Sequence, residues 1–222
     1  MKEFSIVIPA YNEADSLSEL VEKIAQACHN LPYEIIIVDH CSTDNTPDVL
    51  KSLCSKYPQV KPIHVPKKSG KADALRQGIE KATGEIVITM DSDLQDDPAD
   101  IKNFLIAIDK GADLVVGWRQ NRQDSKAKLF ASKIYNKMMN LYSGKNFHDY
   151  NCGFKAFKKA KAASIPLYKN SHRFFTLNAI FRGLKTVEIP ITNHPRKHGK
   201  SKYSPLKYFA FAFDVLVYLR KN

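Results

Sequence analysis

The sequence predicts a single α/β domain with a mostly parallel sheet flanked by helices. Up to about residue 120, the chain repeats a short β-branched run, a polar loop and a helical pattern with a period near 3.6 residues. Most of the β-branched runs are apolar on successive residues, as expected of parallel strands covered on both faces. The 222 residues are 44% apolar, which is enough to bury a continuous core and argues against disorder and fibrous repeats.

Short apolar runs bounded by polar loops predict the strands. They cover Phe4–Ile8, Glu34–Asp39, Val60–Val65, Glu85–Met90, Asp113–Gly117 and Thr186–Ile191. Ser16, with Glu19 three residues later, has the capping-box pattern that predicts the start of the first helix. Thr46 before Pro47 predicts the start of the second helix. Gly84 is predicted to end the third.

Beyond residue 125 the regular alternation fades. We expect a helix near Lys126–Tyr142, an irregular segment around Asp149–Phe157 and a second helix near Arg173–Arg182. After the last strand, a basic loop with the sequence HPRKHGKSKY leads into a final apolar helix. No repeat or Pro/Ser-rich linker divides the chain, so 1–222 is predicted to be one domain.

The composition indicates which class of binding partner and which cellular compartment to expect. Lys and Arg number 34 against 23 Asp and Glu, and this formal charge of +11 favours a phosphate-bearing or polyanionic partner. The four cysteines are scattered and lack zinc-site spacing, so we expect reduced thiols in a cytoplasmic chain. The first apolar run is too short for a signal peptide, and no window reaches the roughly 18 apolar residues of a spanning helix.

The loops after the first four predicted strands hold the informative polar residues. In an open α/β sheet, ligands bind outside the carboxyl ends of the strands, so these loops should face one site. Their sequences are PAYNE, DHCSTD, KKSGK and DSDLQDD. Lysines hold phosphate oxygens and carboxylates hold a hard divalent cation, so acidic and basic loops together are typical of phosphate-handling enzymes.

Asp91 and Asp93 give the sharpest signal in these loops. Alternate residues of an extended segment project to one side, so the two carboxylates can face one metal ion, and Gln95 continues the alternation as a neutral oxygen ligand. The alternative is an acidic turn that caps the helix beginning near Pro98. The position after a buried strand favours the metal site.

Asp39 and Lys71 have both a functional and a structural interpretation. Asp39 could accept a hydrogen bond from a nucleoside, or it could be a turn aspartate. Lys71, next to Gly70, could reach a diphosphate, or it could be a surface lysine that opens a helix. The G-x-G-x-x-G fingerprint and the P-loop motif are absent, which argues against a dinucleotide-dependent oxidoreductase and a P-loop NTPase.

Six stretches of the sequence resemble family 2 glycosyltransferases of the GT-A fold, and most closely the polyprenyl-phosphate sugar synthases of the dolichol-phosphate mannosyltransferase type. They are SIVIPAYNEADS, IIIVDHCSTDNT, SGKADALRQGIEKATGEIVITMDSDLQDDP, GADLVVGWRQNR, DYNCGFKAF and HPRKHGKSKY. Two motifs are specific: D-S-D-L-Q-D-D-P, and R-x-x-G-x-S-K-Y near the C-terminus. The chain departs from the family pattern at His40 and Cys41, where the family usually has Asp and Gly, and at Ala72, where it usually has Gly.

The resemblance implies an inverting transfer of a sugar from a UDP- or GDP-linked donor to a polyprenyl phosphate such as dolichyl or undecaprenyl phosphate. It implies a donor half in 1–120, an acceptor-side half in 121–203 and an apolar C-terminal helix in 204–222. On the donor side it implies a nucleoside pocket, diphosphate contacts and a Mg²⁺ or Mn²⁺ site. The corresponding residues are Pro9, Tyr11, Glu13 and Asp39 for the nucleoside, Lys71 and Ser92 for the diphosphate, and Asp91, Asp93 and Gln95 for the metal. On the acceptor side, the residues that would hold the phosphate and close the site are Arg119, Lys128, Ser132, Arg196 and Lys202.

A phosphate acceptor suits this set of cations. A phosphate monoester is largely a dianion at neutral pH and needs positioning rather than a general base. If the acceptor were instead a sugar hydroxyl, as in surface polysaccharide synthesis, Asp149 would be the candidate base; a structural loop aspartate is the alternative. A nucleic-acid-binding domain would also be basic, but the acidic loop repels nucleic-acid phosphates, so we expect no nucleic acid partner.

The segment Tyr208–Leu219 is apolar around nearly its whole predicted circumference. It is too short to span a bilayer, and with the basic loop before it we expect it to lie on an anionic membrane surface. A buried helix or a contact between two copies of the chain is the alternative. We therefore expect a protein at the inner face of the membrane, with an oligomer possible.

Overall fold

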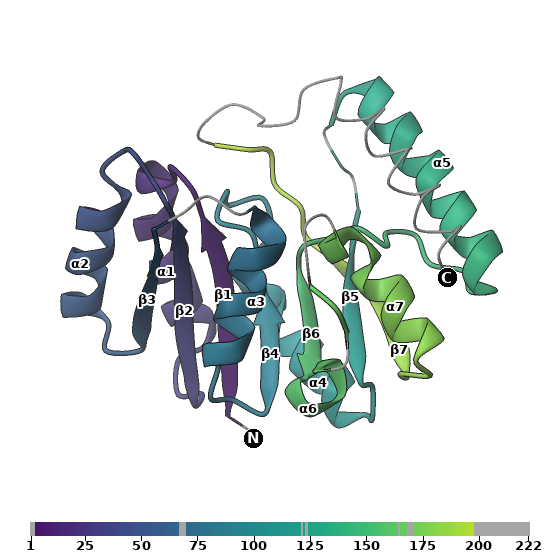
Figure 1. Ribbon diagram of the computed structural model, residues 1–222, viewed down its shortest axis with the longest axis horizontal. Coiled ribbons are helices and arrows are strands. Elements are labelled where there is room, and N and C mark those ends of the chain that lie inside the picture. The colour runs from purple at the N-terminus through teal and green to yellow at the C-terminus, as the bar shows by residue number, and fades with distance from the viewer. Residues whose placement is uncertain are drawn as a thin grey trace.

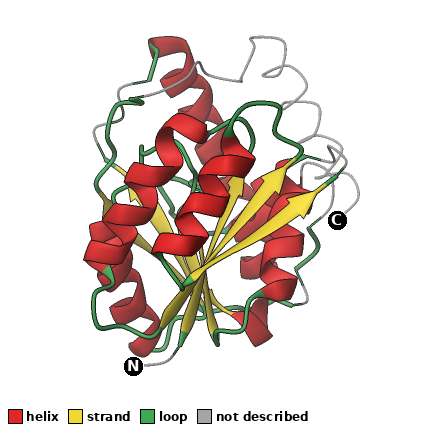
Figure 2. Cartoon of the chain, turned by 90° about the vertical axis from the view of Figure 1, so that its left-hand side faces the viewer, coloured by secondary structure: helices red, strands yellow, loops and turns green. Residues whose placement is uncertain are grey.

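A seven-stranded sheet runs through the molecule, with helices on both of its faces (Figures 1 and 2). The computed structural model describes residues 3–66, 70–120, 122, 124–163, 165–167 and 171–197. The strands lie in the order β3-β2-β1-β4-β6-β5-β7. They are β1 (Phe4–Ala10), β2 (Tyr33–His40), β3 (Val60–Val65), β4 (Ile86–Thr89), β5 (Leu114–Arg119), β6 (Lys155–Lys158) and β7 (Thr186–Ile191). The predicted α/β fold with a mostly parallel sheet is confirmed.

β6 is the exception to the parallel arrangement. It pairs antiparallel with both β4 and β5, whereas the other pairs in the sheet are parallel. The sequence predicts an irregular segment around Asp149–Phe157, and this prediction is wrong for β6. The run is only four residues long and begins and ends with lysine, so neither length nor alternation marks it as a central strand.

The helices follow the predicted order, with corrections at two ends. They are α1 (Ala14–Ala27), α2 (Thr46–Lys56), α3 (Lys71–Lys81), α4 (Ile101–Asp109), α5 (Lys126–Ser143), α6 (Lys159–Ala162) and α7 (Phe175–Phe181), with 3₁₀ turns at Pro98–Asp100 and Ser171–Phe174. The predicted capping box at Ser16 is wrong, because α1 begins at Ala14 and the Ser16 hydroxyl contacts Glu13. Gly84 does not end α3; a Cβ there would come within 2.6 Å of the Phe4 backbone, so the close approach of β1 requires glycine.

Two clusters of buried apolar side chains form the core. The large one joins the sheet to its covering helices, and its strand residues, such as Ile6, Val38 and Val115, are inaccessible to solvent. The small one lies between α5 and α7 and consists of Tyr135, Met139, Phe147, Tyr150, Phe174 and Leu177. The small cluster fixes α5 beside the β5 side of the sheet.

Among the residues that the structure describes, no helix is both long and apolar enough to cross a bilayer. All four cysteines are free, as predicted. The predicted C-terminal helix in 204–222 and Lys202 lie outside the described residues.

Candidate active site

A cavity of about 200 Å³ opens beside the carboxyl end of β4 and reaches across to α5. It brings together eight of the residues singled out in the sequence: Lys71, Asp91, Asp93, Gln95, Arg119, Lys128, Ser132 and Arg196. The acidic side chains lie on the β4 side, where Lys71 and Arg196 contact them, and Lys128 and Ser132 lie on the α5 side. The cavity can therefore accept a ligand that is bound partly through a cation and partly through anionic oxygens.

Each carboxylate of the Asp91 and Asp93 pair contacts a basic side chain. Lys71 Nζ lies 2.5 Å from Asp91 Oδ1, and Arg196 Nη2 lies 2.5 Å from Asp93 Oδ2. Burial would raise the pKa of Asp91, but the charge of Lys71 outweighs burial and lowers it. Burial, with the neighbouring charge of Asp91, raises the pKa of Asp93. The two carboxylates therefore repel each other, and Lys71 and Arg196 offset their charge in this structure.

Arg196 reaches Asp93 because the acidic loop is tied to the segment that follows β7. The backbone N–H of His194 donates to the carbonyl of Gln95 at 2.7 Å, and Asn193 forms an isolated bridge with Asp96. These contacts place Arg196 on the acidic side of the cavity. Its guanidinium also contacts Gln95 Oε1 at 3.5 Å.

Two carboxylates and an amide oxygen suit Mg²⁺ or Mn²⁺. Arg196 contacts oxygens of both Asp93 and Gln95, so these oxygens already converge on one positive group. Beside Asp91 the chain has Gly153, where a Cβ would come within 2.9 Å of both carboxylate oxygens. In the described part of the chain, no group of three or more His, Cys, Asp or Glu side chains is placed to hold a metal ion.

The loops after β1 and β2 lie outside the lining of this cavity. This applies to Pro9, Tyr11, Glu13 and Asp39, the residues that the resemblance assigns to the nucleoside. Asp39 is almost fully buried, accepts from the Ser42 N–H at 3.1 Å and contacts His64 Nδ1 at 2.9 Å. These contacts are compatible with a turn aspartate, and the nucleoside role of Asp39 stays a prediction.

Further hydrogen bonds join the two loops. Asn12 N–H donates to Ser42 Oγ at 2.9 Å, and Thr43 N–H donates to Asn12 Oδ1 at 2.8 Å. The Glu13 N–H donates to Thr46 Oγ1 at 3.0 Å. Ser92, between the two carboxylates, is buried and does not line the cavity.

Two of the departures from the family pattern, His40 at the end of β2 and Cys41 directly after it, take structural positions. Cys41 has a φ of +59°, the left-handed conformation that glycine adopts without steric cost. His40 Nε2 accepts a hydrogen bond from the Gly70 N–H at 3.0 Å, which links the β2 loop to the start of α3. The loop therefore keeps a glycine-like backbone although it has cysteine there.

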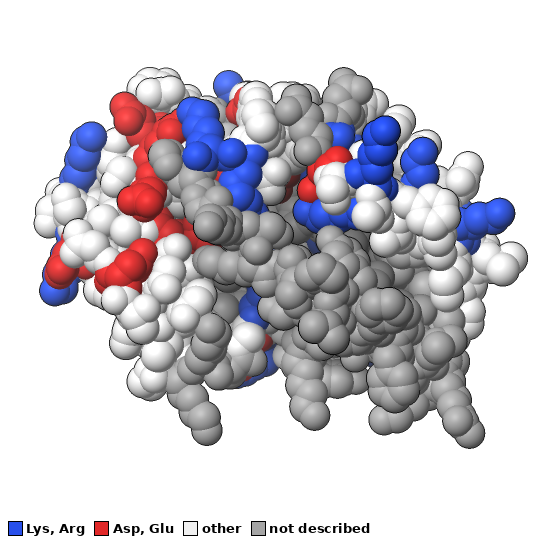
Figure 3. Space-filling view, turned by 90° about the horizontal axis from the view of Figure 1, so that it is seen from above, with Lys and Arg blue, Asp and Glu red and all other residues white. Residues whose placement is uncertain are grey.

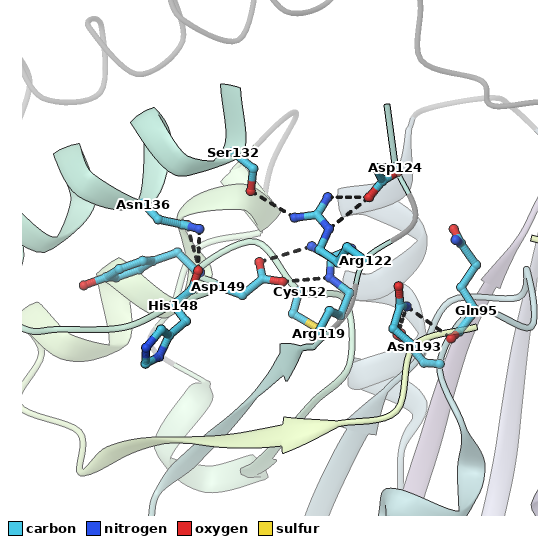
Figure 4. Close-up of polar contacts among 12 residues, drawn as sticks. Gln95, Arg119, Arg122, Asp124, Ser132, Asn136, His148, Asp149, Cys152 and Asn193 are labelled. Carbon is cyan, nitrogen blue, oxygen red and sulfur yellow. Dashed lines mark hydrogen bonds and ion pairs between the residues drawn. The ribbon is translucent and has the colours of Figure 1, made fainter. Parts of the chain in front are cut away.

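Arg119 and Asp149 form a two-point ion pair (Figure 4). Arg119 Nε donates to Asp149 Oδ2 at 2.7 Å and Nη2 to Oδ1 at 3.1 Å. Burial would raise the pKa of Asp149, but Arg119 outweighs it and lowers the pKa, so the carboxylate is ionised. Glu188 also accepts from the Asp149 N–H at 2.7 Å. The pair fits the structural role considered for Asp149 more closely than that of a free base.

A second set of polar contacts, centred on Arg122 and Asp124, lies on the α5 side of the cavity. Arg122 Nε donates to Asp124 Oδ2 at 2.9 Å and Nη1 to Ser132 Oγ at 2.9 Å, as Figure 4 shows. Lys128 contacts the other oxygen of Asp124. Ser125 begins α5 by accepting from the Lys128 N–H at 3.4 Å, which orients Lys128 and Ser132 to the cavity.

Sequence reasoning missed several polar residues of the cavity, among them Lys155 and His172. Burial lowers the pKa of Lys155, and its ammonium donates to the Cys152 carbonyl. Burial, with the charges of Lys71 and Arg173, lowers the pKa of His172 to about 3, so the imidazole is neutral. Its Nδ1 is buried and has no hydrogen-bond partner among the residues that the structure describes. No local pattern marks these residues; only the fold brings them to the cavity.

Comparisons with known proteins agree with this geometry. Residues 5–165 match the model of the family described as Glycosyl transferase family 2. The chain belongs to glycosyltransferase family 2. It is 33% identical over 218 residues to the undecaprenyl-phosphate 4-deoxy-4-formamido-L-arabinose transferase of Edwardsiella ictaluri (strain 93-146), a match that covers 97% of this chain and 67% of the relative.

Solved structures of glycosyltransferases share the fold at lower identity. The glucosyl-3-phosphoglycerate synthase of Mycobacterium tuberculosis, in complex with phosphoglyceric acid, superposes with a TM-score of 0.73 at 18% identity over 89% of this chain and 73% of its own. The same enzyme in complex with Mn²⁺, uridine diphosphate and phosphoglyceric acid gives 0.71 at 18% identity over 94% and 74%. The Staphylococcus aureus TarS fragment 1–349 gives 0.62 at 21% identity over 85% and 58%. These neighbours confirm the GT-A fold.

Proposed function

We propose that this chain is an inverting glycosyltransferase that moves a sugar from a UDP- or GDP-linked donor to a polyprenyl phosphate. One observation carries the proposal: a single cavity joins the Asp91 and Asp93 carboxylates to a group of basic and hydroxyl side chains around Arg122 and Ser132. The name of the Edwardsiella relative, a transferase for undecaprenyl phosphate, supports the same acceptor class.

The donor half, 1–120, would bind the nucleoside diphosphate at the acidic side. Asp91, Asp93 and Gln95 would hold Mg²⁺ or Mn²⁺, which neutralises the charge of the leaving diphosphate when bound. Lys71 and Arg196 are the counter-charges of these carboxylates in the described structure. Once the carboxylates bind a metal, both side chains would be released to contact phosphate oxygens.

The acceptor-side half, 121–203, would position the lipid phosphate. Arg122 and Lys128 share Asp124, so an incoming dianion can compete with that carboxylate for both cations. The phosphate oxygen would attack the anomeric carbon, the bond to the diphosphate would break, and no proton need be removed. A general base is therefore not required, which agrees with an Asp149 held by Arg119.

A hydroxyl acceptor is the second candidate, because Asp149 is ionised and lies beside the cavity residue Arg119. In that case Asp149 would have to leave Arg119 and accept the hydroxyl proton as the bond forms. The two candidates differ in the acceptor that they require. An assay with matched acceptors separates them.

The test is transfer from labelled UDP- and GDP-sugars to a short polyprenyl phosphate and to the corresponding polyprenol, each with Mg²⁺, with Mn²⁺ and with a chelator. We expect labelled product only with the phosphate and a divalent ion, and Asp149→Asn, if folded, should retain part of that turnover. Product with the polyprenol or a sugar acceptor but not with the phosphate would overturn the proposal. If no donor gives product in the presence of Mg²⁺ or Mn²⁺, the proposal is overturned as well.

A further inference from the structure

Glu188, on the edge strand β7, accepts several hydrogen bonds from the loop that follows α5. Its Oε1 accepts from the backbone N–H groups of His148 at 2.9 Å and of Asp149 at 2.7 Å. Its Oε2 lies 2.8 Å from His148 Nδ1, and the Glu188 side chain is only 10% exposed. A carboxylate forms stronger hydrogen bonds than a neutral acceptor does. One side chain of β7 therefore fixes both the backbone and a ring of this loop.

Two asparagines of α5 hold the same loop from its other side. Asn140 donates to the Phe147 carbonyl at 2.9 Å and accepts from the Phe147 N–H at 2.8 Å. Asn136 donates to the His148 carbonyl and accepts from the Tyr150 N–H at 3.3 Å. Backbone groups of a loop need such partners when they are removed from water. α5 thus fixes the loop on both sides of position 149, and β7 fixes that position itself.

The loop places two consecutive side chains against two consecutive residues of β5. The His148 ring stacks on Trp118, with ring centroids 3.9 Å apart and an angle of 13° between the planes. Asp149 pairs with Arg119 through two hydrogen bonds. Successive residues of a strand point to opposite faces, so the loop contacts the end of β5 on both faces. A shift of the loop would therefore move the guanidinium of Arg119, which lines the cavity.

The orientation of Arg119 matters for an anionic ligand. Seen from above in Figure 3, basic side chains occur on the side of the molecule where α5 lies, and acidic ones gather mainly on the opposite side. An acceptor phosphate would therefore approach the side of the cavity that Arg119 and Arg122 line. Arginine binds a phosphate through two N–H groups in a fixed plane, so a small displacement of the guanidinium weakens the contact.

We propose that Glu188 is a positioning residue: by holding the loop at His148 and Asp149, it keeps the Arg119 guanidinium oriented toward an anionic ligand in the cavity. Glu188 does not itself line the cavity, so it acts through Asp149 and not on the ligand. The identity of that ligand, a polyprenyl phosphate, rests on the proposed function. The hold on Arg119 rests on the contacts above. The sequence places Glu188 only within a predicted strand.

The test variant is Glu188→Gln, which keeps the size of the side chain but replaces one accepting oxygen with an N–H donor. The matched control is Glu80→Gln on α3, which makes the same chemical change in an exposed ion pair with Arg76. Titration calorimetry of the full chain with a short polyprenyl phosphate measures acceptor affinity, and titration with UDP or GDP plus Mn²⁺ measures nucleotide affinity. We expect Glu188→Gln to weaken acceptor affinity about tenfold or more and to change nucleotide affinity by less than about twofold. Glu80→Gln should change neither affinity.

A double-mutant cycle tests whether Glu188 acts through Arg119. In an Arg119→Met background, adding Glu188→Gln should change acceptor affinity by less than about twofold, because no guanidinium is left to position. If Arg119→Met does not fold, Arg119→Met with Asp149→Asn is the background. An additional loss as large as in the wild-type background would overturn the inference. Wild-type acceptor affinity in the single variant Glu188→Gln would overturn it as well.

Tryptophan fluorescence gives a readout that does not depend on acceptor binding. The chain has a single tryptophan, Trp118, and its ring lies against the His148 ring that Glu188 contacts. Glu188→Gln should therefore change the emission of the folded protein and its quenching by acrylamide, and Glu80→Gln should not. Leu20→Ala, which empties a buried position on α1, should leave both the emission and the acceptor affinity unchanged. This control separates positioning from a general loss of stability.

Failure of this inference can be distinguished from failure of the proposed function. If the wild type binds no polyprenyl phosphate but Glu188→Gln still changes the emission of Trp118, the proposed acceptor is wrong and the hold on the loop stands. If the wild type binds the polyprenyl phosphate and Glu188→Gln changes neither the affinity nor the emission, the positioning role is wrong and the proposed function stands.

Discussion

The β1–β4 half of the sheet and the region of α5 and α7 are stabilised in different ways. In the first, strand residues such as Ile6 and Val38 are fully buried, and the buried Glu34 has several partners. In the second, the core is a small cluster, and the buried Asp149 and Lys155 lie with the partly exposed Arg119 around a cavity. The difference indicates that apolar packing holds the β1–β4 half of the sheet, whereas ion pairs organise the region around the cavity.

The largest effect on transfer activity should come from a substitution in the acidic loop after β4. Asp93→Asn removes one charge from the pair that would hold the metal, and we expect transfer to fall by about a thousandfold or more with the fold retained. Asp97→Asn is the control: Asp97 lies in the same loop but caps the 3₁₀ turn and contacts His194. Initial rates and circular dichroism of both variants provide the check. Equal losses in the two would remove the special role of Asp93.

Removal of only one partner of the Arg119–Asp149 ion pair should destabilise the fold. Asp149→Asn leaves the partly exposed Arg119 guanidinium without its carboxylate, and we expect a loss of about 2–4 kcal/mol in the free energy of unfolding. The double variant Arg119→Met with Asp149→Asn should recover part of that loss. Urea denaturation measures both. A loss below about 1 kcal/mol for Asp149→Asn would mean that the pair does not organise this region.

The stability cost of replacing one leucine in each region compares the packing of the two regions directly. Leu20→Ala on α1 empties a fully buried position and should cost about 2–5 kcal/mol, whereas Leu141→Ala on α5 should change stability by less than about 0.5 kcal/mol. The same denaturation measurement applies to both. A large loss for Leu141→Ala would mean that its side chain is packed in solution.

Glu34 should give the donor half a pH dependence of its own. Burial would raise the pKa of Glu34, but Lys61, Ser5 and Thr83 outweigh it and lower the pKa to about 2 from 4.5. Its contribution is therefore fully present above pH 4.5 and is lost as the pH falls toward 2. Glu34→Gln should cost about 1–3 kcal/mol at pH 7, and the difference from wild type should narrow below pH 4.5. If the stability difference between Glu34→Gln and wild type stays constant down to pH 3, the network does not hold Glu34 ionised.

The smallest effect concerns the β2 loop. Cys41 has a positive φ, so Cys41→Gly should relieve local strain and raise the free energy of unfolding by about 0.5–1 kcal/mol. Cys54→Gly, on helix α2, is a control expected to destabilise. Thermal unfolding of both variants measures these changes in stability. Destabilisation by Cys41→Gly would show that the thiol makes contacts that outweigh the backbone strain.

The sequence was most informative where the determinants are local. The strands of the donor half were predicted to within two residues at each end, because their apolar runs are continuous and bounded by polar loops. The Asp91 and Asp93 pair could be placed at a strand end for the same reason. Segments with such local signals need no knowledge of distant contacts.

The rest could not be predicted because it depends on contacts between distant residues. β6 is a short lysine-bounded run that becomes a strand only between β4 and β5. Arg119 pairs with Asp149 thirty residues away, and Arg196 meets Asp93 across nearly half of the chain. The large apolar side chains that α5 exposes, such as Phe130 and Leu141, were predicted simply as part of a helix, since periodicity does not tell which side the fold leaves uncovered.

We expect the acidic side of the cavity to bind the donor and the α5 side to bind the acceptor phosphate. Calorimetric titration of Asp93→Asn and Arg122→Gln, each with a nucleoside diphosphate plus Mn²⁺ and with a short polyprenyl phosphate, measures the two affinities separately. We predict a crossed pattern: Asp93→Asn loses the metal-dependent nucleotide affinity and keeps the acceptor affinity, and Arg122→Gln does the reverse. Loss of both affinities in both folded variants, or the opposite pattern, would contradict the account.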